Sequence, residues 1–110
     1  MGASSAVAEL WRALEDAGAE VLLTGHDHDY ERFAPQTGDR VADTHGIREF
    51  VVGTGGAALR SFGATKPHSV VRSSRTHGVL KLTLREEAYN WTFVPVAGGT
   101  FTDSGSGTCH

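Results

Sequence analysis

Two histidines, His26 and His28, stand on alternate positions directly after a short apolar run, residues 21–24. Residues i and i+2 of an extended segment point to the same side. Both imidazoles can therefore face one metal ion or two adjacent ions, which ring nitrogens bind well. Gly25 lets the backbone turn sharply as it leaves the apolar run. Ligands also collect where strands of α/β sheets end in loops, so the sequence predicts a metal site here.

A histidine pair of this kind has a simpler interpretation, in which each ring hydrogen-bonds to a backbone carbonyl and holds a loop. The flanking residues favour metal ligation instead. From Gly25 to Arg32 the chain reads Gly-His-Asp-His-Asp-Tyr-Glu-Arg. This string resembles the last metal-ligand motif of the calcineurin-like metallophosphoesterases, and it is most similar to their purple-acid-phosphatase-like branch.

The resemblance implies a hydrolase with a binuclear centre of divalent or trivalent ions, Fe, Mn or Zn, that cleaves phosphoesters. In that family the first histidine of the motif binds one metal and the second binds the other, and these roles fall on His26 and His28. Metal ions of such a centre polarise phosphoryl oxygens and lower the pKa of bound water. The resemblance implies that Tyr30, Glu31 and Arg32 orient the ligand rings. The alternative for Glu31 is a weak surface ion pair.

The family also uses earlier ligand motifs, Asp-x-His, Gly-Asp-x-x-Asp and Gly-Asn-His, and none of them precedes the histidine pair in this sequence. Two histidines cannot hold two ions, because each ion takes about four ligands or more. The chain therefore resembles the C-terminal portion of a metallophosphoesterase, and an N-terminal segment of the same domain is its expected partner beside the phosphoester substrate. Residues 48–56 and 78–96 are similar to the strands of secreted bacterial members, so secretion is implied by resemblance alone.

Hydrophobic periodicity predicts the elements that position this motif. Leu10, Trp11 and Leu14 share a face at helical spacing, which predicts a helix from about residue 6 to 17, with Gly18 ending it. Residues 21–24 form a continuous apolar run, which is typical of a strand covered on both faces.

Beyond the motif, residues 33–46 are polar and predict a loop or an irregular hairpin. Residues 47–52 are rich in β-branched and aromatic side chains and predict a second strand. Residues 57–76 lack a sustained period and predict an irregular excursion.

The clearest strand pattern lies near the C-terminus. Leucines alternate with polar residues over 80–84, and aromatic residues alternate over 89–93, which predicts an antiparallel hairpin with leucine facing aromatic residues. Pro95 marks the end of the second strand. Residues 98–110 are dominated by Gly, Ser and Thr, and we expect them to be poorly ordered unless another segment holds them.

These elements predict an α/β fold. Combined with the resemblance, they imply the C-terminal part of a four-layer α/β/β/α sandwich over residues 1–97, followed by a tail at 98–110. A glycine-rich string, Gly53 to Ala58, fits a dinucleotide fingerprint. That interpretation fails because no helical pattern follows, and no Asp or Glu occurs between Glu49 and Glu86 to meet a ribose.

Composition excludes several classes of function. The net charge of −3 argues against nucleic acid as a partner. No apolar run is long enough to cross a membrane, and the first residues lack the basic start and apolar core of a signal peptide. Cys109 is the sole cysteine, so it is either a free thiol or half of a bridge to a segment elsewhere.

The sequence thus predicts metal-dependent phosphoester hydrolysis, by a phosphatase or phosphodiesterase, in a complete protein to which this chain contributes its histidine pair. We expect the isolated chain to be weak or inert as an enzyme, and no side chain is assigned a direct catalytic role. Two alternatives remain open. One is a noncatalytic module that binds a single metal ion or docks on a partner through exposed sheet edges. The other is a truncated fragment without an independent role.

Overall fold

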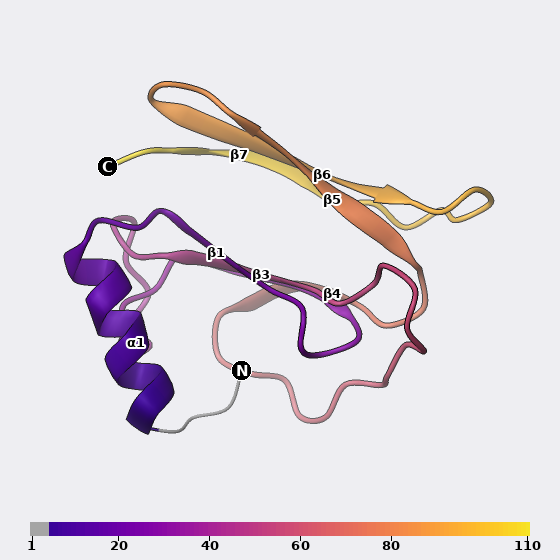
Figure 1. The fold of residues 1–110 in the computed structure, drawn as a ribbon, viewed down its shortest axis with the longest axis horizontal. Helices are drawn as coiled ribbons and strands as arrows, with labels where there is room; N and C mark the ends of the chain where they lie inside the picture. The colour runs from indigo at the N-terminus through magenta and orange to yellow at the C-terminus, as the bar shows by residue number, and fades with distance from the viewer. Residues whose placement is uncertain (1–4) are drawn as a thin grey trace.

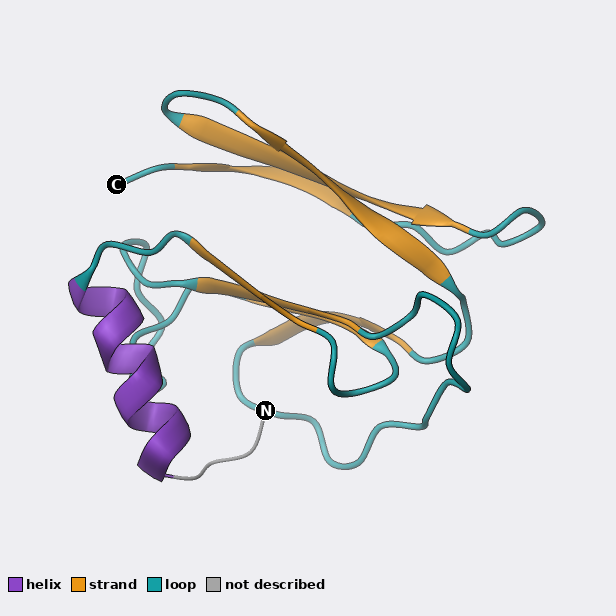
Figure 2. Ribbon diagram, in the orientation of Figure 1, coloured by secondary structure: helices purple, strands orange, loops and turns teal. Residues whose placement is uncertain are grey.

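Three layers make up the computed structural model, which describes residues 5–110 (Figures 1 and 2). A three-stranded sheet lies over a four-stranded sheet, and one helix lies on the outer side of the four-stranded sheet. The chain is therefore a small mixed α/β domain built mostly from strands. Residues 1–4 lie outside the described residues. The prediction that the first residues lack the features of a signal peptide therefore falls partly outside the structure. In the described range no helix combines the length and the apolar character that crossing a membrane requires.

The predicted N-terminal helix is confirmed as α1, Ser5–Asp16. It ends in the way that Gly18 indicated. Gly18 has a φ of 80°, and the amides of residues 18 and 19 donate to the carbonyls of residues 15 and 14, which is a Schellman ending. The apolar face is covered in part, because Trp11 is buried whereas Leu10 is 59% exposed.

Four strands form the sheet that carries the histidine motif, in the order β1-β3-β2-β4. They are β1 Val21–Thr24, β2 Tyr30–Phe33, β3 Arg48–Val52 and β4 Ser69–Ser73. β1 runs parallel to β3, and the other pairs are antiparallel. The structure confirms the strands predicted at 21–24 and 47–52. The prediction of an irregular segment at 57–76 was wrong in part, because β4 lies within it.

One expectation about β1 was wrong. The apolar run predicted a strand covered on both faces, but β1 is an edge strand and Leu23 is 53% exposed. The neighbouring strand β3 is the buried one, because Phe50 and Val51 are almost fully covered. The polar stretch after β2 was predicted to be a loop or an irregular hairpin. It is an irregular hairpin, closed by bridges from Gln36 to Ala42 and Ile47.

The second sheet contains β5 Gly78–Leu84, β6 Ala88–Pro95 and β7 Ser104–Thr108, all antiparallel, in that order. The predicted hairpin is confirmed with its side-chain pairing, and β6 ends at Pro95 as expected. The facing pairs are Leu80 with Phe93, Leu82 with Trp91, and Leu84 with Tyr89.

The Gly- and Ser-rich tail was expected to be poorly ordered unless another segment held it. That segment is β6, which pairs with β7. In β7, Gly105 lies on the ring of Trp91 and Gly107 on the ring of Tyr89, and a methyl group at either glycine would overlap the ring. The aromatic side chains of β6 therefore occupy the space that side chains of β7 would fill. The low hydrophobicity of this segment reflects that arrangement and not disorder.

Replacing Gly105 by Ala should lower the free energy of unfolding by about 1–3 kcal/mol, because the new methyl group displaces Trp91 in a packed core. Urea denaturation followed by tryptophan fluorescence measures this change. Ser106→Ala is the matched control, since Ser106 is exposed on the same strand. Equal urea midpoints for the two variants would show that the ring contact is unimportant.

The core lies between the two sheets. Tyr30 and Phe50 come from the four-stranded sheet, and Tyr89, Trp91 and Phe93 come from β6. The rings of Tyr30 and Phe93 are 4.8 Å apart between centroids, and those of Phe50 and Trp91 are 5.3 Å apart. Such tilted and edge contacts add to the burial energy. The sheets are therefore joined through aromatic side chains on facing strands.

Candidate functional site

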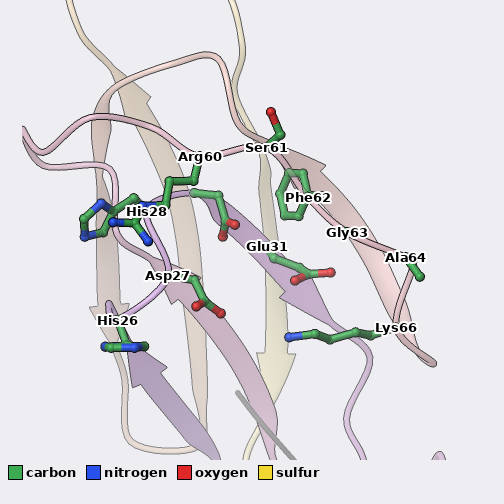
Figure 3. A pocket seen from close by; sticks show the side chains of 11 residues that line it. His26, Asp27, His28, Glu31, Arg60, Ser61, Phe62, Gly63, Ala64 and Lys66 are labelled. Carbon is green, nitrogen blue, oxygen red and sulfur yellow. The ribbon is translucent and has the colours of Figure 1, made fainter.

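His26 and His28 lie in the loop that joins β1 to β2, at the carboxyl end of the parallel pair β1 and β3. Figure 3 shows both rings on the same side of one pocket. The pocket has a volume of about 370 Å³. Its acidic lining comes from the same loop and from β2, as Asp27, Asp29 and Glu31, and its opposite wall comes from residues 60–66. Both histidines therefore line one cavity, but residues 26–29 form a series of bends and not the extended segment on which the spacing argument depended.

The ring of His28 is oriented by a backbone contact from a distant segment. Its Nδ1 lies 3.1 Å from the carbonyl oxygen of Ala58, and the amide of Arg60 donates to the carbonyl of His28 at 3.0 Å. When Nδ1 carries the proton it donates to Ala58, and Nε2 keeps its lone pair. That tautomer is the one a metal-ligating imidazole uses. The same contact is also the loop-holding hydrogen bond of the simpler interpretation.

The carboxylates beside the histidines differ in their surroundings. Asp29 is 7% exposed, and its Oδ1 is buried without a hydrogen-bond partner among residues 5–110. Burial, followed by the negative charges of Asp27 and Glu31, raises the pKa of Asp29 above its ordinary value. Glu31 is buried too, but it accepts a hydrogen bond of 2.6 Å from the Ser69 hydroxyl. β4 thus supports one of the pocket carboxylates.

The donor set does not by itself fit a binuclear metal centre. Within residues 5–110, no three side chains of His, Cys, Asp or Glu converge closely enough to hold a metal ion. Two imidazoles and the nearby carboxylates line the pocket without forming a complete ligand group. A centre at His26 and His28 therefore requires ligands beyond those that the described residues bring together.

The three residues that follow the histidine pair are divided between two faces of β2. Glu31 lines the pocket, whereas Tyr30 and Arg32 point into the space between the sheets. There the Tyr30 hydroxyl donates to Asp103 at 2.6 Å, and Arg32 forms an ion pair with Asp103 at 2.8 Å. Burial, with the Asp103 carboxylate, raises the pKa of Tyr30 well above its ordinary value. Of the three, Glu31 alone shares the pocket with the histidines.

Gly53 determines how closely the histidine loop approaches β3. Its amide donates to the carbonyl of Asp29 at 2.9 Å, and a methyl group at this position would overlap the carbonyl oxygen of Asp27. The glycine-rich string that follows β3 is therefore a close backbone contact under the candidate site. Its presence directly after a strand was the sequence signal for that contact.

Sequence reasoning missed the contribution of residues 58–66. Arg60 and Lys66 line the pocket opposite the histidine loop, and Figure 3 shows the Arg60 side chain extending towards His28. The sequence signal that could have indicated this basic wall was charge, because the segment lies in the stretch between Glu49 and Glu86 that contains no Asp or Glu. No local pattern indicated that it folds back onto the loop.

The remaining histidines lie outside the pocket. His68 and His77 contact the carbonyls of Arg40 and Ala57. His110 lies 3.1 Å from the Glu20 carboxylate, and its ring centroid is 5.3 Å from that of His45. His45 and His110 are therefore neighbours in space although 65 residues apart in the sequence.

Searches for related proteins give no further support for the motif resemblance. No family model, curated protein or solved structure matches the chain.

Proposed function

We propose that this chain supplies His26 and His28 to the metal centre of a metallophosphoesterase, which hydrolyses phosphoesters. The observation that carries the proposal is the placement of both rings in one pocket at the carboxyl end of β1. The hydrogen bond between His28 Nδ1 and the Ala58 carbonyl supports it, because it leaves Nε2 for a ligand. When bound, the metal ions would polarise the phosphoryl group and activate water.

The other ligands would come from an N-terminal segment of the same domain, completing a four-layer sandwich. Two exposed sheet edges support this part of the proposal. β1 and β5 are edge strands of their sheets, and together they line an apolar groove of about 330 Å³. Leu23 on β1 and Val79 on β5 are 53% and 58% exposed. An additional strand along β1 would pair its free backbone groups and cover these side chains.

Metal binding tests the proposal directly. Equilibrium dialysis of the chain together with the upstream segment of the same domain, against Zn²⁺ or Mn²⁺ and with metal content measured per chain, should show that His26→Ala and His28→Ala each weaken binding by at least about tenfold, since each removes a ligand. His45→Ala is the control, because His45 lies outside the pocket. Unchanged metal affinity in both pocket variants would refute the proposal.

An aryl phosphate assay on the isolated chain and its two pocket variants tests whether ligands are missing. We expect little or no turnover by the isolated chain. Metal-dependent turnover that disappears in both pocket variants would show that the chain holds a complete site, and the missing-segment proposal would then fail.

The exposed edges also favour a second candidate, a noncatalytic module that binds one metal ion or docks on a partner. One metal ion per chain, with no turnover even after addition of the upstream segment of the same domain, would support this candidate over the phosphoesterase.

A further inference from the structure

The segment that forms the far wall of the pocket has an unusual charge. Residues 57–76 contain four basic side chains, Arg60, Lys66, Arg72 and Arg75, and no acidic one, in a chain whose net charge is −3. Such a concentration of one sign in an acidic protein attracts anions.

These four residues surround two adjoining pockets. Arg60 and Lys66 line the pocket of the histidines, and Arg72 and Arg75 line a second pocket of about 470 Å³. The two pockets share Phe62 and Gly63. The Arg72 guanidinium lies over the Phe62 ring, 5.3 Å from its centroid, so Phe62 fixes the arginine at the junction. The two pockets therefore adjoin at Phe62 and Gly63, and together they are called the groove below.

The positive charges of the groove are available to a ligand. Within residues 5–110, the ion pairs involve Arg12, Arg32 and His110, and none of the four groove residues lies within 4.0 Å of a carboxylate. Lys66 is close enough to Asp29 to act on the pKa of that carboxyl. The guanidinium groups of Arg60, Arg72 and Arg75 keep their donors for other partners.

We propose that this groove binds an organic phosphoester that carries a second anionic group. One phosphoryl group lies beside His28 and Arg60, and the second anionic group lies at Arg72 and Arg75. The assignment of the first group rests on the proposed function, whereas the second pocket is argued from its own residues. Guanidinium groups suit this task because they donate two parallel hydrogen bonds to phosphate oxygens.

The two pockets differ in whether they need a cation to bind an anionic group. Asp27, Asp29 and Glu31 repel an anion in the first pocket, so binding there should be stronger with a cation beside the histidines. The second pocket has no acidic lining residue, and it adds the hydroxyls of Thr65, Ser73 and Ser74. It should therefore bind an anionic group without metal, and a second anionic group should increase the affinity of a substrate.

Isothermal titration calorimetry of the full chain, at low ionic strength and with and without Mn²⁺, tests this inference. The probes are fructose 1,6-bisphosphate and fructose 6-phosphate, which differ by one phosphoryl group. The bisphosphate should bind about tenfold more tightly or better. Arg75→Gln, and separately Arg72→Gln, should reduce this preference, and Arg85→Gln should leave it unchanged because Arg85 lies outside both pockets.

Equal affinities for the two probes in both conditions, or no binding of either, would overturn the inference. So would a preference that survives in both groove variants. The metal content of each sample separates this result from the test of the proposed function. Metal bound at the histidines without a bisphosphate preference refutes the groove alone. A bisphosphate preference, combined with metal affinity that His26→Ala and His28→Ala leave unchanged in the presence of the upstream segment, refutes the proposed phosphoesterase and retains the anion groove.

Discussion

Asp103→Asn is expected to destabilise the fold by about 3–5 kcal/mol, the range for breaking a buried ion pair by removing one partner. Asp103 is 9% exposed and accepts hydrogen bonds from Tyr30 at 2.6 Å and from Arg32 at 2.8 and 3.1 Å. The Arg32 side chain is 13% exposed. The neutral amide would leave its guanidinium buried without a counter-charge between the sheets.

The pH dependence of stability should report the same carboxylate. Burial opposes ionisation of Asp103, but hydrogen bonds from Arg32 and Tyr30 outweigh it and hold the pKa of this carboxyl below its ordinary value of 3.8. The unfolded chain therefore binds this proton more readily than the folded one. The contribution of Asp103 is present above that ordinary value and is lost as pH falls through the lower pKa of the folded state.

Urea denaturation at pH 7 and at pH 3 measures both effects. Asp39→Asn is the matched control, because its ion pair with Arg12 is exposed and should change stability by less than about 1 kcal/mol. The double variant Arg32→Met, Asp103→Leu should recover much of the loss by removing both charges. A single Asp103 variant no less stable than the Asp39 variant would contradict the assigned role.

Periodicity was sufficient for much of this fold. The helix, β1, β3 and the hairpin of β5 and β6 follow from apolar spacing, including the facing pairs such as Leu82 and Trp91. β7 could not be predicted in this way. Its glycines carry no hydrophobic signal, because their function is to admit the rings of Trp91 and Tyr89, and those rings belong to another strand.

The candidate site shows a similar division. His26 and His28 line one pocket, but a bent loop places them there and not the alternation of an extended segment. The resemblance also grouped Tyr30 with the site, although strand alternation turns that side chain towards Asp103, which is 73 residues away. The basic wall was missed because residues 58 and 60 contact His28 through their own backbone carbonyl and amide, and such contacts leave no pattern in the side chains of that segment.

The coverage of β1 was misjudged for a physical reason as well. A continuous apolar run indicates coverage on both faces, but it does not say whether the covering strand belongs to the same chain. The exposed Leu23 and the groove between β1 and β5 are consistent with a cover supplied by another segment.

Gly53→Ala should affect both stability and the candidate site, because the added methyl group would overlap the backbone carbonyl of Asp27 between the two histidines. Relief requires a shift of the loop or of the end of β3. We expect a loss of about 1–3 kcal/mol in the free energy of unfolding, as for other overpacked positions. We also expect weaker Zn²⁺ or Mn²⁺ binding, since displaced imidazoles no longer face the same cavity.

Gly55→Ala is a close control, two residues along the same glycine-rich string, where an added methyl group would meet no atom within 4 Å. Urea denaturation and equilibrium dialysis on both variants separate the two effects. If Gly53→Ala loses stability but binds metal as tightly as Gly55→Ala, the placement of the loop on β3 does not govern the histidine pair. Such a result would mean that the metal site tolerates movement of its backbone. A site held in place by the contact between Gly53 and Asp27 should not tolerate that movement.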